Sequence, residues 1–324
     1  GAVEVLDRYA FRIHLKRPFP QLIYYLAMHC TTPVAREAVE FYDGRRHDGE
    51  LRPDFHKFYA VGTGAYRIVE YVPRQRIRLM RIPDYNTLRF PTDSFPPEKA
   101  EWLQQLAGKP LPFIDEVNFS IIRENIPIFV LTRQGYLDGM AANKDSFAAL
   151  LTAERELSPK YRERGMLLEK DAEPSTFWLS FNLEDPLIGS NKKLRQALSC
   201  AYDAKTYSGI FYSGVAPVAT QLIPPGIYGH DKNRTNPYGF NLEKAQQLLA
   251  EAGYPNGRDA SGRQLELTMD SVASGSEDRQ RSEFDQRCFE RLGIRVRVIE
   301  NTFPQLLQKQ DNGNFQIAAG SGWG

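Results

Sequence analysis

The chain has 324 residues, of which 42% are hydrophobic, so it is long enough for about two domains with sizeable cores. Its 41 lysines and arginines nearly balance its 40 aspartates and glutamates, whereas nucleic-acid-binding proteins concentrate basic residues, so we expect no nucleic-acid partner. The longest apolar run, Leu22 to Met28, is far shorter than the ~20 residues of a membrane-spanning helix, which predicts no direct membrane span in this chain.

The first elements alternate between strand-like and helix-like patterns. Residues 3–5 and 9–15 alternate apolar and polar side chains, which predicts two strands. The apolar stretch 22–29 predicts a buried helix. Pro33 precedes a second predicted helix over 35–39, because proline is favoured in the first turn of a helix.

A hairpin and a long excursion follow. The alternating stretches 67–72 and 76–80 are joined by a short polar turn, which predicts a β-hairpin. The stretch 86–112 is rich in proline and predicts a surface excursion or insertion. Residues 113–119 return to a strand pattern.

The second half begins with an apolar strand over 177–181 and two amphipathic helices. Ser190 is placed to cap the first helix and Asn241 the second, and Gly253 stands at the C-terminal stop of the second. Apolar residues repeat at helical spacing along both helices: Leu194, Ala197, Leu198 and Ala201, then Ala245, Leu248, Leu249 and Ala252.

The last part of the chain alternates strand and helix patterns. Strands are predicted at 265–269, 294–299 and 315–319, with helices at 277–292 and 303–310 between them. This order predicts an α/β domain with a mainly parallel sheet, in which ligands lie at the carboxyl ends of the strands.

No catalytic or metal-binding pattern is present in the sequence. The 5 histidines form no metal motif, the 3 cysteines lie far apart, and there is neither a nucleophile elbow nor a phosphate-binding loop. We therefore expect no catalytic residue, no metal ion and no cofactor. A metal-dependent hydrolase, one of three functions considered, has no positive support.

Aromatic residues are the enriched class, with 16 Tyr, 19 Phe and 3 Trp. Trp178 and Trp323 both stand at strand positions followed by small or polar residues, where the edge of a sheet opens into a cleft. Two interpretations stay open for each: an aromatic wall for a ligand, or an ordinary core residue.

Six segments occur in the order in which one known family carries them. They are FRIHLKRPF (11–19), VGTGAY (61–66), RIPDYN (81–86), LRQAL (194–198), EKAQQLLAEAGYP (243–255) and GSGWG (320–324). Through them the chain resembles the family 5 extracellular solute-binding proteins, whose members include oligopeptide-, dipeptide- and nickel-binding proteins. Ala65 and Ile82 depart from the family pattern, where proline and asparagine are usual.

The resemblance implies an α/β fold like that of class II periplasmic binding proteins, with two mixed α/β lobes joined by a hinge. Residues 1–172 would belong to the first lobe, with an accessory-subdomain strand at their start, and residues 173–324 to the second lobe. Family members have further segments before Val3 and beyond Gly324, so both lobes are expected to be incomplete in this chain.

The resemblance also implies a function without enzymatic activity. The protein would bind a peptide or another small solute in the interlobe cleft and deliver it to the membrane permease of an ABC importer. The family's usual export signal implies a periplasmic protein or a cell-surface lipoprotein. The alternative is a ligand-sensing domain of a transcription regulator, because some regulators carry this fold.

Ligand contacts are carried over from the family residue by residue. The strand after the hinge and the glycine–tryptophan turn supply most of them, and the loop after residues 135–139 supplies the rest. The implied ligand-binding residues are Trp178, Ser180, Gly322, Trp323, Gly324, Met140 and Asn143.

Overall fold

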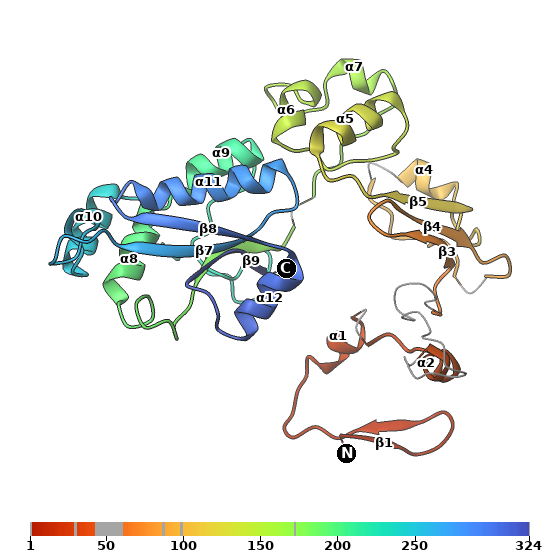
Figure 1. The fold of residues 1–324 in the computed structure, drawn as a ribbon. Helices are drawn as coiled ribbons and strands as arrows, with labels where there is room; N and C mark the ends of the chain where they lie inside the picture. The colour runs from red at the N-terminus through yellow and green to blue at the C-terminus, as the bar shows by residue number, and fades with distance from the viewer. Residues whose placement is uncertain are drawn as a thin grey trace. The chain divides into compact units, whose positions relative to one another are not determined.

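The computed structural model describes residues 2–28, 31–42, 61–85, 88–97, 100–171 and 173–323 (Figure 1). The chain separates into two compact units, residues 1–121 and residues 122–324. Within the described ranges, no helix is both long enough and apolar enough to cross a membrane.

Among its described residues, the first unit has two small antiparallel sheets and three short helices. One sheet pairs β1 with β2, and the other has the order β3-β4-β5, so the predicted hairpin and the strands around it are confirmed. The strands are β1 (Val3–Val5), β2 (Phe11–Ile13), β3 (Tyr66–Val72), β4 (Arg76–Arg81) and β5 (Glu116–Ser120). The helices are α1 (Leu22–Leu26), α2 (Arg36–Tyr42) and α4 (Ala100–Gln104).

The prediction of a buried helix over 22–29 is wrong for the residues that the structure describes. Helix α1 has no buried residue, and Ile23 and Tyr24 are 66% and 69% exposed. The helix is little more than one turn long, and too few described side chains pack over it to cover its apolar residues. His29 lies outside the described residues.

The second unit is built on a four-stranded sheet with the order β6-β9-β7-β8 (Figure 1). Strand β7 pairs in parallel with both β8 and β9, and β6 pairs antiparallel with β9, so the predicted mainly parallel sheet is confirmed. The strands are β6 (Thr176–Phe181), β7 (Glu266–Val272), β8 (Arg295–Asn301) and β9 (Ile317–Trp323).

Helices cover this sheet and extend the unit. Five of them follow β6 along the chain: α8 (Lys192–Ala201), α9 (Ala204–Tyr212), α10 (Leu242–Glu251), α11 (Ser276–Glu290) and α12 (Phe303–Asp311). A short 3-10 turn, η3 (Pro255–Gly257), follows α10. Three more helices precede β6: α5 (Asn125–Gln134), α6 (Lys144–Leu150) and α7 (Pro159–Arg162).

Two separate hydrophobic cores lie in the second unit. The larger is formed by the sheet with α8, α10 and α11, and includes Leu198, Met269 and Phe289, all fully buried. The smaller lies among α5, α6 and α7 and is centred on Leu150 and Tyr161. The free cysteines Cys200 and Cys288 are both buried within the unit.

The opposite face of β7 carries a buried charge. Successive residues of a strand point to opposite faces, so Asp270 lies away from the core that Met269 enters. Asp270 is 1% exposed. Its carboxylate accepts a hydrogen bond from Asn301 Nδ2 of β8 at 3.0 Å and pairs with Lys309 Nζ of α12 at 2.5 Å. This cluster fixes α12 to both strands.

The predicted helix caps are partly confirmed. Asn241 accepts a hydrogen bond from the Lys244 backbone amide and caps α10, as predicted. Helix α8 is capped by Asn191, which accepts from the Leu194 amide at 3.0 Å, and not by Ser190. The Ser190 hydroxyl instead donates to the Pro186 carbonyl, because Ser190 belongs to the turn before the helix.

Candidate functional site

Four of the residues that the resemblance implies as ligand contacts lie on two adjacent strands. Trp178 and Ser180 are on β6, while Gly322 and Trp323 are on β9. In the register, Trp178 lies opposite Ser321, and Gly322 lies opposite its neighbour Phe177. Strand β9 runs parallel to β7, so this end of the pair is the carboxyl edge of the sheet, where α/β folds bind ligands. Gly324 lies outside the described residues.

The Trp178 indole is held in place on β6. Its Nε1 donates a hydrogen bond to Ser180 Oγ at 3.0 Å, across an irregularity in the register between the two residues. The side chain is half-buried, so part of its flat apolar face is available for contact. An aromatic ring beside a hydroxyl group offers both apolar and polar contacts to a small ligand.

Glycines allow the close approach at this edge. A Cβ at Gly322 would lie 2.7 Å from the Phe177 ring, which is closer than real Cβ atoms come. Gly320 has φ +81°, a backbone conformation that residues with a side chain rarely adopt. Gly320 and Gly322 of the GSGWG motif are therefore explained by local geometry at the end of β9.

Met140 and Asn143 lie among the helices around the smaller core. The Asn143 side chain accepts a hydrogen bond from the Asp145 amide at 3.1 Å and caps α6. Met140 packs against the cluster of Leu150 and Tyr161. The structure thus gives both residues a local structural role and assigns neither of them a described contact with β6 or β9.

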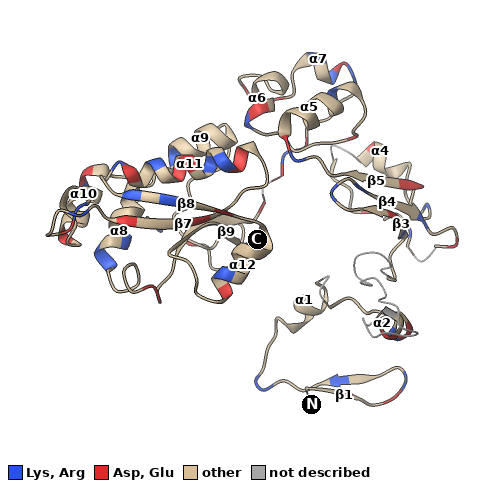
Figure 2. Ribbon diagram, in the orientation of Figure 1, with Lys and Arg blue, Asp and Glu red and all other residues tan. Residues whose placement is uncertain are grey.

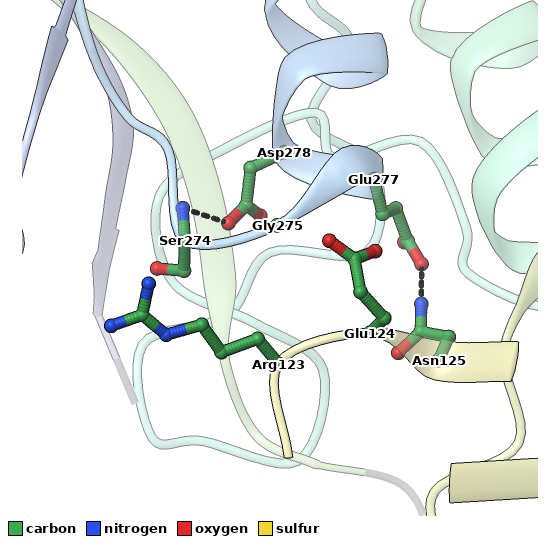
Figure 3. A pocket seen from close by; sticks show the side chains of 7 residues that line it. All are labelled: Arg123, Glu124, Asn125, Ser274, Gly275, Glu277 and Asp278. Atoms are coloured by element: carbon green, nitrogen blue, oxygen red, sulfur yellow. Dashed lines mark hydrogen bonds between the residues drawn. The ribbon is translucent and has the colours of Figure 1, made fainter. Parts of the chain in front are cut away.

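A pocket that the sequence did not reveal lies at the carboxyl end of β7 (Figure 3). It has a volume of about 140 Å³ and is formed where the segment before α5 meets the start of α11. Its lining residues are Arg123, Glu124, Asn125, Ser274, Gly275, Glu277 and Asp278. The only signal for it in the sequence is a Gly-Ser pair followed by two acidic residues at the predicted start of a helix after a strand.

The acidic groups of this pocket are paired with donors. Glu124 Oε2 accepts hydrogen bonds from Ser276 Oγ at 2.6 Å and from the Ser276 amide at 3.3 Å. These hydrogen bonds from Ser276 hold the pKa of Glu124 below its usual value. Asp278 accepts from the Ser274 amide at 2.8 Å, and Glu277 from Asn125 Nδ2 at 2.5 Å (Figure 3). Throughout the described residues, no three His, Cys, Asp or Glu side chains are grouped to hold a metal ion.

Behind the pocket, α11 carries a row of polar side chains into an aromatic cluster. The Arg281 guanidinium pairs with Glu277, lies 4.6 Å from the centre of the Phe211 ring and donates to Tyr207 OH at 2.8 Å. One turn further, Asp285 accepts a hydrogen bond from Tyr202 OH at 3.0 Å. Burial raises the pKa of Asp285 to about 7. This row fixes the orientation of the start of α11.

Comparisons with known proteins identify the chain's relatives. A family profile described as "Bacterial extracellular solute-binding proteins, family 5 Middle" matches residues 2–324. The glutathione-binding protein GsiB of Salmonella paratyphi A is 25% identical over 297 residues, which cover 91% of this chain and 48% of that protein. The chain therefore spans about half the length of the curated relatives that it matches.

Solved structures show the same fold. The periplasmic binding protein DppA of Helicobacter pylori, in complex with the peptide STSA, aligns with a TM-score of 0.75 and 23% identity over 99% of this chain and 53% of that one. A dipeptide-binding protein of Pseudoalteromonas in complex with Met-Leu aligns with a TM-score of 0.72 and 18% identity over 99% of this chain and 55% of that one. The fold is the class II periplasmic-binding-protein type implied by the sequence motifs. The names of these relatives describe binding proteins and give no support to a regulator domain.

Proposed function

Because the chain belongs to family 5 of the bacterial extracellular solute-binding proteins, we propose that it binds peptides or a related small solute for an ABC importer. The membrane permease of that importer is the partner. The site of action is the periplasm or the outer face of the cell membrane, with the protein free or lipid-anchored. The observation that carries this proposal is the pairing of β6 with β9, which brings Trp178 and Ser180 beside the glycine–tryptophan segment.

The proposed lobes are residues 1–172 and 173–324, with the ligand between them. Their boundary falls within the second compact unit, between its two hydrophobic cores. The helices α5, α6 and α7 have a core of their own around Leu150, whereas β6 opens the strands that pack around Met269. Separate cores on either side of the boundary support two lobes that move as bodies.

The edge at Trp178 suits peptide cargo. Strand β6 ends the described sheet on one side, so backbone groups of an extended peptide have a strand to pair with. The flat face of Trp178 can contact side chains of different shapes without requiring one sequence. Gly322 and Trp323 of β9, and Gly324 after them in the sequence, are the further contacts proposed from this lobe, and Met140 and Asn143 those proposed from the other lobe.

The test is calorimetry on the full-length gene product with glutathione, Met-Leu and Ser-Thr-Ser-Ala as separate probes. We expect saturable one-to-one binding of at least one of them. Native mass spectrometry of protein purified from its host would identify a co-purifying solute. Absence of binding to all three probes, together with a co-purifying solute that contains no peptide bond, would overturn the peptide assignment.

A further inference from the structure

Two hydrogen-bonded contacts join residues 152 positions apart in the sequence. Glu124 accepts from Ser276, and Asn125 donates to Glu277. Figure 3 shows the loop before α5 meeting the first turn of α11 at the pocket. The two contacts are adjacent in both segments, so they form or break together.

The start of α11 lacks a cap of its own. Its N-cap residue is Gly275, which has no side chain to accept from the first amides of the helix. The Glu124 carboxylate takes this role from the other segment, where a negative charge is also favoured by the helix dipole. A Cβ at Gly275 would lie 2.9 Å from the Arg123 carbonyl, so glycine permits the close approach of the two segments.

The second contact is made to a rigid acceptor. Glu277 is paired with Arg281, and its side chain is 14% exposed. The Arg281 guanidinium in turn lies over the rings of Phe211 and Tyr212, at 4.6 and 4.8 Å from their centres. Asn125 therefore meets a carboxylate that is already oriented, which lowers the entropy lost when the contact forms.

We propose that Glu124 and Asn125 form a latch that closes the first lobe onto the start of α11 in the second lobe. This inference rests on the proposed lobe boundary, which places residues 123–125 and 274–278 in different lobes. The latch bonds exist only when the lobes are closed, and a ligand held between the lobes also favours closure. Latch and ligand are therefore thermodynamically linked, and the latch raises affinity without contacting the ligand.

The test uses Glu124→Ala and Asn125→Ala in the full-length gene product, with whichever of glutathione, Met-Leu and Ser-Thr-Ser-Ala the unmodified protein binds. We expect each variant to weaken binding roughly 5- to 50-fold, mostly through faster dissociation, as typical coupling between two sites would give. Ser276→Ala removes the hydroxyl donor on the other side and keeps the backbone amide donor, so it should weaken binding less than Glu124→Ala, and the two effects should not add. Equal affinity of the latch variants and the unmodified protein would overturn the latch.

The matched control is Glu156→Ala. It removes the same charge and breaks a 2.5 Å ion pair with Lys170, but both partners lie in the first lobe. The affinity of Glu156→Ala should equal that of the unmodified protein. A loss of affinity as large as that of Glu124→Ala would show that removing any negative charge weakens binding, and would contradict the latch.

A measurement without ligand separates this inference from the proposed function. We expect the radius of gyration of the ligand-free protein, from small-angle X-ray scattering, to increase in Glu124→Ala and not in Glu156→Ala. If no probe binds but this increase is seen, the latch stands and the peptide assignment fails. If the radius is unchanged and no probe binds, the latch fails as well.

Discussion

At the scale of single residues, Trp178 is the side chain whose loss tests the site most directly. Trp178→Ala in the full-length gene product should weaken binding of the peptide probe by ~1–3 kcal/mol, the usual range for an aromatic anchor. The matched control is Trp102→Ala, because Trp102 lies on α4 and is 61% exposed. Calorimetry that gives Trp178→Ala the affinity of the unmodified protein would make Trp178 a core residue and nothing more.

Asp285 predicts how stability depends on pH. Burial raises the pKa of Asp285 to about 7 from the ordinary 3.8, so the unfolded chain loses this proton at lower pH than the folded protein does. The group's contribution to the free energy of unfolding is therefore present below about pH 4 and is lost as the pH rises to about 7. Urea unfolding should show a decline on the order of 3 kcal/mol from this group over that interval.

The variant Asp285→Asn isolates this contribution. Asparagine keeps a partner for Tyr202 OH but has no proton to lose, so its free energy of unfolding should fall less between pH 4 and pH 7. A variant whose decline with pH matches that of the unmodified protein would show that Asp285 does not titrate in this range.

At the scale of elements, two loops meet backbone to backbone. A Cβ at Gly257, in η3, would lie 2.3 Å from the carbonyl carbon of Gly293, the glycine that follows α11. Gly257→Ala should therefore lower the free energy of unfolding by roughly 2–4 kcal/mol, as overpacking and backbone strain combine. Gly262→Ala is the control, because Gly262 shares the positive φ but faces open space, and it should cost only about 1 kcal/mol. Equal losses in the two variants would remove the steric explanation.

The sequence predicted the helices and strands better than it predicted which residues cap them or pack over them. The buried faces of α8 and α10 follow from helical spacing, and the alternation of strand and helix predicts the parallel pairing of β7 with β8. The cap of α8 was misplaced by one residue, because Ser190 and Asn191 are both good caps and only the turn geometry selects one. The exposure of α1 was missed because an apolar run reveals nothing about what packs over it.

The candidate site shows the same limit. The β9 residues were proposed from the GSGWG motif, and the β6 residues from their place on the strand after the inferred hinge. Strand pairing places Trp178 opposite Ser321, next to Gly322. The contacts of Glu124 with Ser276 and of Asp270 with Lys309 left no pattern in the sequence. Each contact joins residues far apart in the chain. Charged and polar side chains of these types are equally at home in loops and helices exposed to solvent, so their presence in the sequence does not indicate the contact.

At the scale of the whole molecule, ligand binding and the stability of the fold are linked. A ligand that binds the folded protein alone stabilises it by about 2.7 kcal/mol at a concentration of 100 Kd. The melting temperature of the full-length gene product should therefore rise on addition of the peptide probe, and Trp178→Ala should need more probe for the same rise. Differential scanning fluorimetry measures both. A melting temperature that is independent of probe concentration would contradict specific binding.

The burial of two cysteines determines where this protein can be labelled with thiol-reactive dyes. Burial raises the pKa of the Cys200 and Cys288 thiols, and maleimide dyes react with the thiolate. The thiols of Cys200 and Cys288 should therefore stay unmodified while the protein is folded. With Cys30 replaced by serine, a pair of new surface cysteines, one before residue 172 and one after it, would accept a donor and an acceptor dye. Single-molecule fluorescence would then test whether the two proposed lobes open and close.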